Sequence, residues 1–344
     1  MPEKTPVAAD VTETPVLADV TETPVAADVT ETPVLAAEDV TKHFDTGRQI
    51  VRALENVTLR LYRGRIAALV GESGSGKTTL ARLLAQFYPV TSGEIRLRGQ
   101  VVSGPDKKFY SEVQLVFQDP FASLNSLRKV DHNVRRALKL HGHPADEEAV
   151  HALLAKVNLT PAADFAAKLP HELSGGQRQR VAIARALAVQ PSVLLGDEPI
   201  SMLDVSIRLD VLNLLARLRE EEGLALLYIT HDIASARYLS DDIYVMYAGQ
   251  MVEGGPAESV IQEPKHPYTR LLLDSSPDPE RAGSGSAFTA TAKLGEPPSL
   301  VDPPPGCRFH PRCPFAKEKC KTDFPPRTEF ADGSWTNCWL HEES

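Results

Sequence analysis

The segment GESGSGKTT, residues 71–79, combines closely spaced glycines with a lysine and hydroxyl side chains. It fits the pattern G-x-x-x-x-G-K-[ST], in which backbone N–H groups surround phosphate oxygens and a following helix N-terminus adds partial positive charge. We expect Lys77 to reach the β- and γ-phosphates of a nucleotide and Thr78 to offer its hydroxyl to Mg²⁺. The segment predicts a nucleotide site formed by Gly71, Ser73, Gly74, Ser75, Gly76, Lys77, Thr78 and Thr79.

An acidic pair follows a second apolar run, SVLLGDE at residues 192–198. Such a run predicts a buried strand that delivers Asp197 at its carboxyl end, where open α/β sheets bind ligands. We expect Asp197 to hold Mg²⁺ and Glu198 to polarise the water that attacks the γ-phosphate. An acidic pair after a strand is often only a solvated loop, but the phosphate-loop pattern upstream favours the catalytic interpretation.

All four cysteines lie near the C-terminus, at Cys307, Cys313, Cys320 and Cys338. Zinc sites usually show two cysteines separated by two to four residues, and that spacing is absent here. The wider spacing, with prolines between, suits a larger object, and four cysteines are what a 4Fe-4S cluster requires. Two alternatives remain open: four unligated thiols, or a zinc ion with His310 or His341 replacing a cysteine. Any metal would have a structural role, because a tail this short has too little core to fold unaided.

Predicted strands and helices, which must position these residues, alternate along the chain. Short apolar runs at 65–71, 113–118, 192–198 and 225–231 predict buried strands, and helical patterns occur at 77–87, 176–190 and 210–222. Alternation of this kind predicts an α/β fold with a largely parallel sheet. Residues from about 120 to 172 break the rhythm and predict a helical insertion.

The remaining segments set the expected domain boundaries. Residues 1–37 repeat ADVTETPV and contain many prolines, which predicts a disordered acidic tail. The α/β domain is expected at 38–275, a Gly/Ser/Pro-rich linker at 276–296, and a Cys-rich extension at 297–344.

Charge and hydropathy exclude several classes of protein. Residues 1–38 hold eight acidic side chains and one lysine, so they carry most of the net charge of −9. The rest of the chain is nearly neutral, which gives no support to nucleic-acid binding. No apolar run is long enough to span a bilayer, and no secretory signal is visible. We therefore expect a cytosolic protein whose membrane contact is peripheral.

A third motif, LSGGQ at residues 173–177, completes a resemblance to the ATP-binding subunits of ABC transporters. In that family it is the signature, here Leu173, Ser174, Gly175, Gly176 and Gln177, and it acts on the ATP of a partner subunit. The resemblance implies the ABC-type ATPase fold and implies ATP and Mg²⁺ as ligands. It implies that Gln118 binds Mg²⁺ with Thr78 and Asp197 and acts in catalysis with Glu198 and the switch histidine His231. It also implies a D-loop at Asp204 and an adenine-stacking ring at Phe44.

Two further segments, DPFASLN at 119–125 and HPYTRLLL at 266–273, resemble the oligopeptide/dipeptide importer branch, as does the cysteine tail. The branch implies a second ATPase subunit in a heterodimer, two membrane permease subunits and an extracytoplasmic substrate-binding protein. It also implies peripheral attachment at the cytoplasmic face of the plasma membrane, and a 4Fe-4S cluster in members with this tail. The resemblance is to the F-type ATPase subunit of dipeptide systems. The alternatives are an importer of nickel or another small solute in the same branch, or an ABC ATPase that does not transport.

Overall fold

A computed structural model describes residues 32–275 and 295–342. Most of the acidic repeat and of the expected linker lie outside these residues. The sequence predictions for 1–31 and 276–294 are therefore not addressed by the structure.

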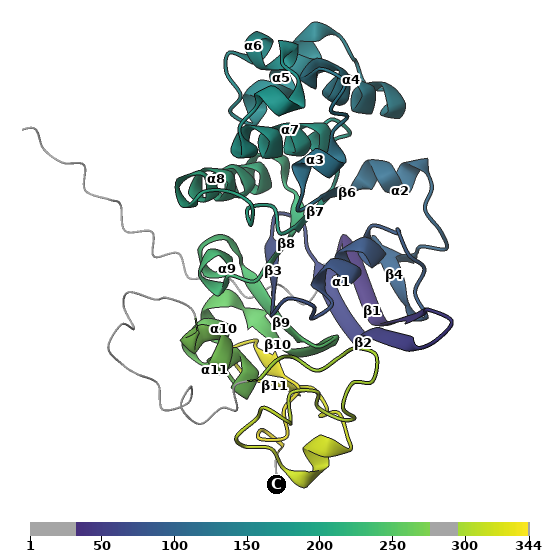
Figure 1. Cartoon of the computed structure of the whole chain (residues 1–344), viewed down its shortest axis with the longest axis vertical. Helices are drawn as coiled ribbons and strands as arrows, with labels where there is room; N and C mark the ends of the chain where they lie inside the picture. The colour runs from purple at the N-terminus through teal and green to yellow at the C-terminus, as the bar shows by residue number, and fades with distance from the viewer. Residues whose placement is uncertain (1–31, 276–294, 343–344) are drawn as a thin grey trace, which may run out of the picture.

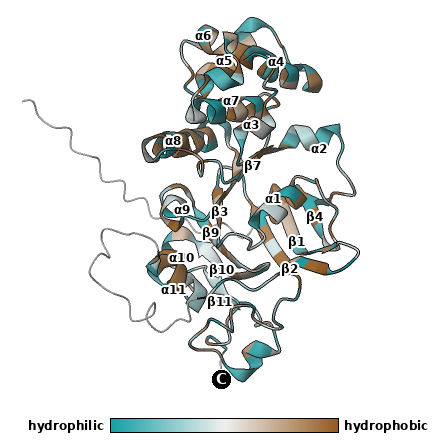
Figure 2. Cartoon of the chain, in the orientation of Figure 1, coloured by the Kyte–Doolittle hydropathy of each residue, from teal (hydrophilic) through white to brown (hydrophobic). Residues whose placement is uncertain are grey.

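The central sheet contains all the strands expected from the apolar runs. They are β3 (Ile66–Val70), β6 (Val113–Val116), β7 (Val193–Asp197) and β8 (Ala225–Thr230). Together with β9 (Asp242–Tyr247) they pair in parallel in the order β9-β3-β8-β7-β6, and β10 (Gln250–Pro256) joins β9 antiparallel. Every residue of β3, β7 and β8 is buried, as expected of parallel strands covered on both faces. Figure 2 shows β3 and β7 as hydrophobic strands in the middle of the molecule.

Three helices match the expected helical segments, namely α1 (Lys77–Leu84), α7 (Gly175–Leu187) and α8 (Val205–Glu222). Three more, α9 (Ile233–Leu239), α10 (Ala257–Gln262) and α11 (Pro267–Asp274), were not predicted. The α/β fold predicted from the alternation is thus confirmed.

A second, antiparallel sheet was not predicted. It has the order β2-β1-β4-β5, formed by β1 (Leu35–Asp45), β2 (Ile50–Leu61), β4 (Ser92–Leu97) and β5 (Gln100–Val101). Strand β1 begins at Leu35, which lies before residue 38, the expected start of the α/β domain. The β1–β2 hairpin brings the region of Phe44 beside the glycine-rich loop.

Helices occupy the region of the expected insertion, about 120–172. They are α3 (Pro120–Ser123), α4 (Val130–His141), α5 (Glu147–Lys156), α6 (Ala162–Ala167) and the 3₁₀ helix η1 (Pro170–Glu172). Helix α2 (Lys107–Glu112) lies before this region and leads into β6. Helices α4 to α6 form one end of the long axis of the molecule, and the C-terminal tail forms the other (Figure 1).

The tail is joined to the central sheet. It contains the 3₁₀ helix η2 (Glu318–Lys321) and the two-residue strands β11 (Thr328–Glu329) and β12 (Trp335–Thr336). Strand β12 pairs antiparallel with β10, and β11 pairs with β12, so the tail extends the sheet at its β10 edge. Trp335 is 4% exposed and packs against Tyr244 of β9, which anchors the extension.

None of the helices in the described ranges is both long enough and apolar enough to cross a membrane.

Candidate functional site

The glycine-rich loop joins the end of β3 to the start of α1, and its conformation requires glycine at two positions. Gly71 has φ of 157°, and a Cβ there would lie 2.1 Å from the Met246 carbonyl oxygen. Gly76, the N-cap of α1, has φ of 104°, and a Cβ there would lie 2.7 Å from the Ala53 oxygen. The loop is therefore pressed against the surrounding backbone with its N–H groups at a helix N-terminus, an arrangement suited to phosphate.

Lys77 is 5% exposed and lies inside this loop. Its Nζ donates hydrogen bonds to the carbonyl oxygens of Gly71, at 2.8 Å, and Glu72, at 2.9 Å. Burial lowers the pKa of the Lys77 ammonium, and the carboxylates of Glu198 and Asp197 oppose that shift. The ammonium is thus held where phosphate oxygens could replace the two carbonyl acceptors.

Thr78 and Asp197, which the sequence predicts as oxygen ligands of Mg²⁺, contact each other. The Thr78 hydroxyl donates to Asp197 Oδ1 at 2.9 Å, and Asp197 is 4% exposed. Burial raises the pKa of the Asp197 carboxyl, although the Thr78 hydrogen bond opposes the shift. A hydroxyl and a carboxylate are hard oxygen donors of the kind that Mg²⁺ prefers, so these residues fit the ion.

Glu198 lies between two other predicted residues. Its Oε2 accepts a hydrogen bond from Gln118 Nε2 at 3.1 Å and lies 3.4 Å from His231 Nδ1. The three side chains come from the ends of β7, β6 and β8, so the carboxyl edge of the parallel sheet brings them together, as expected for this topology.

Ser73 to Thr79, Gln118, Glu198 and His231 line one open groove of about 760 Å³, within the range of small-molecule and cofactor sites. Gly71 and Asp197 do not line it, but Asp197 touches its wall through the Thr78 hydroxyl. Phe44 lies in its wall and meets Tyr88 edge-on at a centroid distance of 5.3 Å. Sequence reasoning missed Val51, Ala53, Glu72, Leu272 and Leu300, which also line the groove. Leu300 belongs to the tail, and its carbonyl oxygen accepts from the Arg52 N–H at 2.7 Å; no local sequence pattern indicated this contact.

The signature residues lie elsewhere in the described structure and do not line this groove. Ser174 is the exposed N-cap of α7, and its hydroxyl accepts from the Gln177 N–H at 3.3 Å, while Gln177 Oε1 accepts from the Ser174 N–H. Asp204 is likewise the N-cap residue of α8. The structure therefore brings together the glycine-rich loop, Phe44, Gln118, Glu198 and His231, but leaves the signature and Asp204 outside.

The four cysteines line one small cavity in the tail, together with His266 and His310. Burial raises the pKa of the Cys307 thiol to about 12 and those of Cys313 and Cys338 to about 11, and the thiols add to one another's shifts. His341 instead donates from Nε2 to the Lys265 carbonyl oxygen, 2.9 Å away. Within residues 32–275 and 295–342, no group of three or more His, Cys, Asp or Glu side chains is arranged so that it could hold a metal ion. The predicted metal site is therefore not supported by the side-chain placement.

Comparison with known proteins agrees with the geometry of the groove. A family model described as "ABC transporter" matches residues 54–201, and one described as "Oligopeptide/dipeptide transporter, C-terminal region" matches residues 252–320. The chain is 41% identical to the di/tripeptide transport ATP-binding protein DppF of Pseudomonas aeruginosa, over 85% of this chain and 93% of DppF. It is 40% identical to the oligopeptide transport ATP-binding protein AppF of Bacillus subtilis, over 89% of this chain and 97% of AppF.

Among solved structures, the chain resembles the dimeric bacterial ABC transporter cassette MJ0796, with a TM-score of 0.59 and 31% identity. The match covers 65% of this chain and 98% of that cassette. The chain belongs to the ATP-binding proteins of ABC transporters, in their oligopeptide/dipeptide branch.

Proposed function

We propose that this chain is the ATP-hydrolysing subunit of an ABC importer for di- and oligopeptides, attached at the cytoplasmic face of the plasma membrane. The observation that carries the proposal is the single groove that gathers the phosphate loop, Gln118, Glu198 and His231. The peptide cargo is supported by the relatives described as oligopeptide and di/tripeptide transport proteins.

In this groove, each residue has a defined task. The loop N–H groups and the Lys77 ammonium bind the β- and γ-phosphates of ATP, while Phe44 stacks on the adenine. Thr78, Asp197 and Gln118 would hold Mg²⁺, and the bound ion would neutralise negative charge on the phosphates. Glu198 orients and polarises the attacking water, and His231 and Gln118 hold the Glu198 carboxylate in place through the contacts described above.

The groove needs a second subunit to close it. Ser174 is exposed at a helix N-terminus, where first-turn N–H groups have no intrahelical partner, yet it does not line its own chain's groove. We assign the signature to the ATP of a partner ATPase subunit, in a heterodimer. The dimeric cassette MJ0796 supports pairing, because it is similar to this chain over most of its own length.

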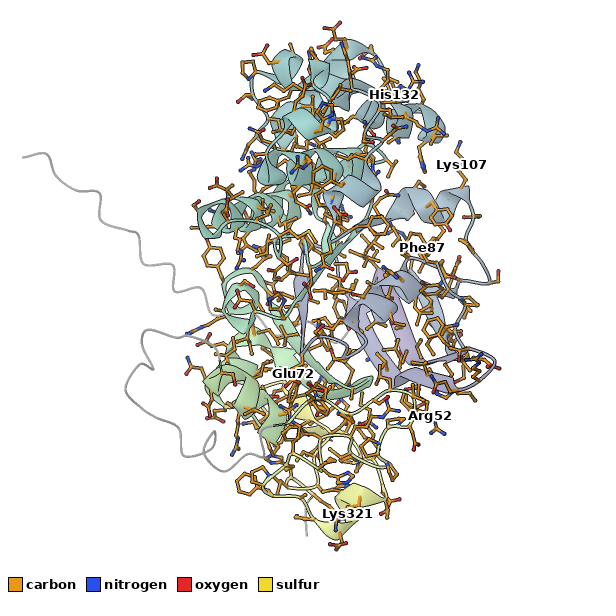
Figure 3. The ribbon with its side chains drawn as sticks, in the orientation of Figure 1. Arg52, Glu72, Phe87, Lys107, His132 and Lys321 are labelled. Atoms are coloured by element: carbon orange, nitrogen blue, oxygen red, sulfur yellow. The ribbon has the colours of Figure 1, made fainter. Side chains whose placement is uncertain are left out.

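Exposed apolar side chains, two of them close to Gln118 in the sequence, suit contact with the permease subunits. Phe87 and Phe117 stack at a centroid distance of 6.0 Å, and Phe87, Phe121 and Leu127 are about half exposed or more. Phe87 lies on the same side of the molecule as Lys107 and His132 (Figure 3). Because Gln118 directly follows Phe117, contact with the permease would reach the Glu198 carboxylate through Gln118. An external substrate-binding protein would act only through the permeases.

We assign a 4Fe-4S cluster with a structural role to the four cysteines. The support is that all four border one cavity, and that two are buried, Cys307 and Cys338. Among the described residues no side-chain group is arranged to hold a metal ion, so the proposal rests on the number of cysteines, which equals the four thiolates that a 4Fe-4S cluster requires.

The cluster is tested by iron, sulfide and zinc content, with a visible spectrum, on anaerobically purified protein. About four irons and four sulfides per chain would support it. One zinc per chain, or no metal, would reject it and leave the ATPase assignment untouched.

The transport function is tested in proteoliposomes that contain this chain, its partner ATPase and the two permeases. ATP should drive accumulation of a labelled dipeptide delivered by the binding protein, and Lys77→Ala should abolish it. Accumulation that persists in the Lys77→Ala assembly, or ATP hydrolysis stimulated by a non-peptide solute alone, would reject the proposal.

A further inference from the structure

Glu72, the second residue of the glycine-rich loop, is held through all three of its polar groups. Its N–H donates to the Tyr268 hydroxyl at 2.9 Å, and its carbonyl oxygen accepts from Lys77 Nζ at 2.9 Å. Its carboxylate accepts from Arg312 Nη1 at 3.1 and 3.0 Å. Tyr268 belongs to α11 and Arg312 to the cysteine tail, so two of the three partners come from the C-terminal region. Figure 3 shows Glu72 at the junction between the ATPase core and that tail.

Arg312 is itself firmly placed. Its own N–H donates to the Phe309 carbonyl oxygen at 3.0 Å, in the turn that leads to Cys313. Its guanidinium also donates to the Tyr247 hydroxyl at 3.2 Å, and its side chain is 12% exposed. Arg312 Nε is buried and has no hydrogen-bond partner among the described residues. The contacts with the Phe309 turn and the Tyr247 hydroxyl hold the Arg312 guanidinium at the Glu72 carboxylate.

An aromatic cluster joins the two C-terminal partners of Glu72. Phe309 packs against Tyr268 at a centroid distance of 5.4 Å and against Tyr247 at 5.2 Å. Tyr268 and Phe309 are fully buried. The tail and α11 therefore act on the loop as one packed unit rather than as two independent contacts.

We propose that Arg312 is a positioning residue that acts through Glu72 to set the affinity of the groove for ATP. The proposal rests on the nucleotide site assigned above. Glu72 lines the groove, so its carboxylate, if unpaired, would repel a triphosphate; Arg312 neutralises that charge and fixes the loop before the nucleotide arrives.

This role predicts a specific kinetic pattern. Glu198 and His231 make no described contact with Arg312, so the chemical step should not depend on it. Loss of Arg312 should raise the Kd and KM for ATP and leave kcat nearly unchanged. This pattern is expected when an interaction stabilises the ground state and the transition state equally. A purely structural defect would instead lower the active fraction, and therefore kcat, without changing the Kd.

The test is a double-mutant cycle with Arg312→Met and Glu72→Gln, read as the Kd for ATP and as KM and kcat. Arg312→Met should weaken ATP binding about fivefold or more in the parent chain, and Arg312→Lys should recover part of the loss. In the Glu72→Gln background, Arg312→Met should have almost no further effect, because its partner charge is gone.

Arg327→Met is the matched control. Arg327 is also a tail arginine that pairs with a glutamate, Glu329, and covers an aromatic ring, Trp335, but Glu329, unlike Glu72, does not line the groove. It should leave the Kd for ATP at the parental value. Equal effects of Arg312→Met in both backgrounds, or an unchanged Kd, would overturn the proposal.

If Arg312→Met does not fold, the cycle is run with Arg312→Lys instead. Arg312→Lys should then change the Kd for ATP in the parent chain but not in the Glu72→Gln chain. A change of the same size in both chains would refute the role. Failure of the proposed function would look different, because the parent chain itself would not bind ATP and Lys77→Ala would change nothing.

Discussion

At the scale of single residues, Glu198 has an uncommon backbone conformation that the neighbouring strand stabilises. Its φ of 48° lies in the left-handed region, which non-glycine residues adopt at a cost of about 1–3 kcal/mol. Its N–H donates to the Ile229 carbonyl oxygen of the neighbouring strand at 3.1 Å, which holds it in that state. The sequence predicted Glu198 from its place after an apolar run, but this conformation depends on pairing with β8 and had no local signal.

Glu253 on β10 gives a pH dependence of stability. It is fully buried and accepts from the N–H groups of Lys265, at 2.6 Å, and His266, at 2.8 Å. Burial raises its pKa from 4.5 to about 7, against the effect of those hydrogen bonds. Folding therefore takes up a proton between these two values, so this group's contribution to the free energy of unfolding falls as pH rises through that window.

We expect Glu253→Gln, which cannot ionise, to become more stable relative to the parent as pH rises from about 5 to about 8. The amide also changes stability by an amount that does not depend on pH, so only the pH dependence of the difference is compared. The free energy of unfolding of both proteins is measured by urea unfolding at a series of pH values. Glu318→Gln, at a side chain that is 90% exposed, is the control and should keep the parental profile. A stability difference between Glu253→Gln and the parent that is independent of pH would contradict the assignment.

At the scale of elements, the sequence was informative where a pattern is local. The parallel strands were predictable because each is a short, continuously apolar run, and α1 and α7 because a loop or N-cap motif precedes a helical period. The antiparallel sheet was not, because β1 and β2 mix buried and exposed positions and their register contains bulges. Strands β11 and β12 have two residues each, too few for any periodicity.

Two substitutions of Ser174, the N-cap of α7, distinguish its capping role from its proposed contact with a partner subunit. Ser174→Ala should lower stability by about 1 kcal/mol, because the Gln177 N–H loses its acceptor. Ser174→Arg should in addition block closure on the partner's nucleotide, so that hydrolysis at the partner's site fails. ATP binding by this chain should survive both changes, because Ser174 does not line its own groove.

These outcomes are measured by thermal unfolding, ATP binding to the isolated chain and steady-state hydrolysis by the assembled pair. If Ser174→Arg abolished ATP binding by its own chain, the assignment of the signature to the partner's site would be wrong.

At the scale of the whole molecule, the nucleotide groove is assembled from distant segments. Phe44 comes from the β1–β2 hairpin, Glu198 from the central sheet and Leu300 from the tail. The motif residues were predictable because each carries its own chemistry in a short pattern. Contacts such as Arg312 with Glu72, 240 residues apart, depend on the packing of the tail against the core and leave no trace in local sequence.

We propose that Glu198 is the catalytic carboxylate of a groove that a second ATPase subunit completes. This is tested most directly by comparing ATP binding, subunit association and steady-state hydrolysis in the parent and in Glu198→Gln. We expect nearly unchanged ATP affinity, a loss of hydrolysis of about 100-fold or more, and a stable ATP-bound pair of subunits. Full hydrolysis by Glu198→Gln, or no ATP-dependent association, would contradict it.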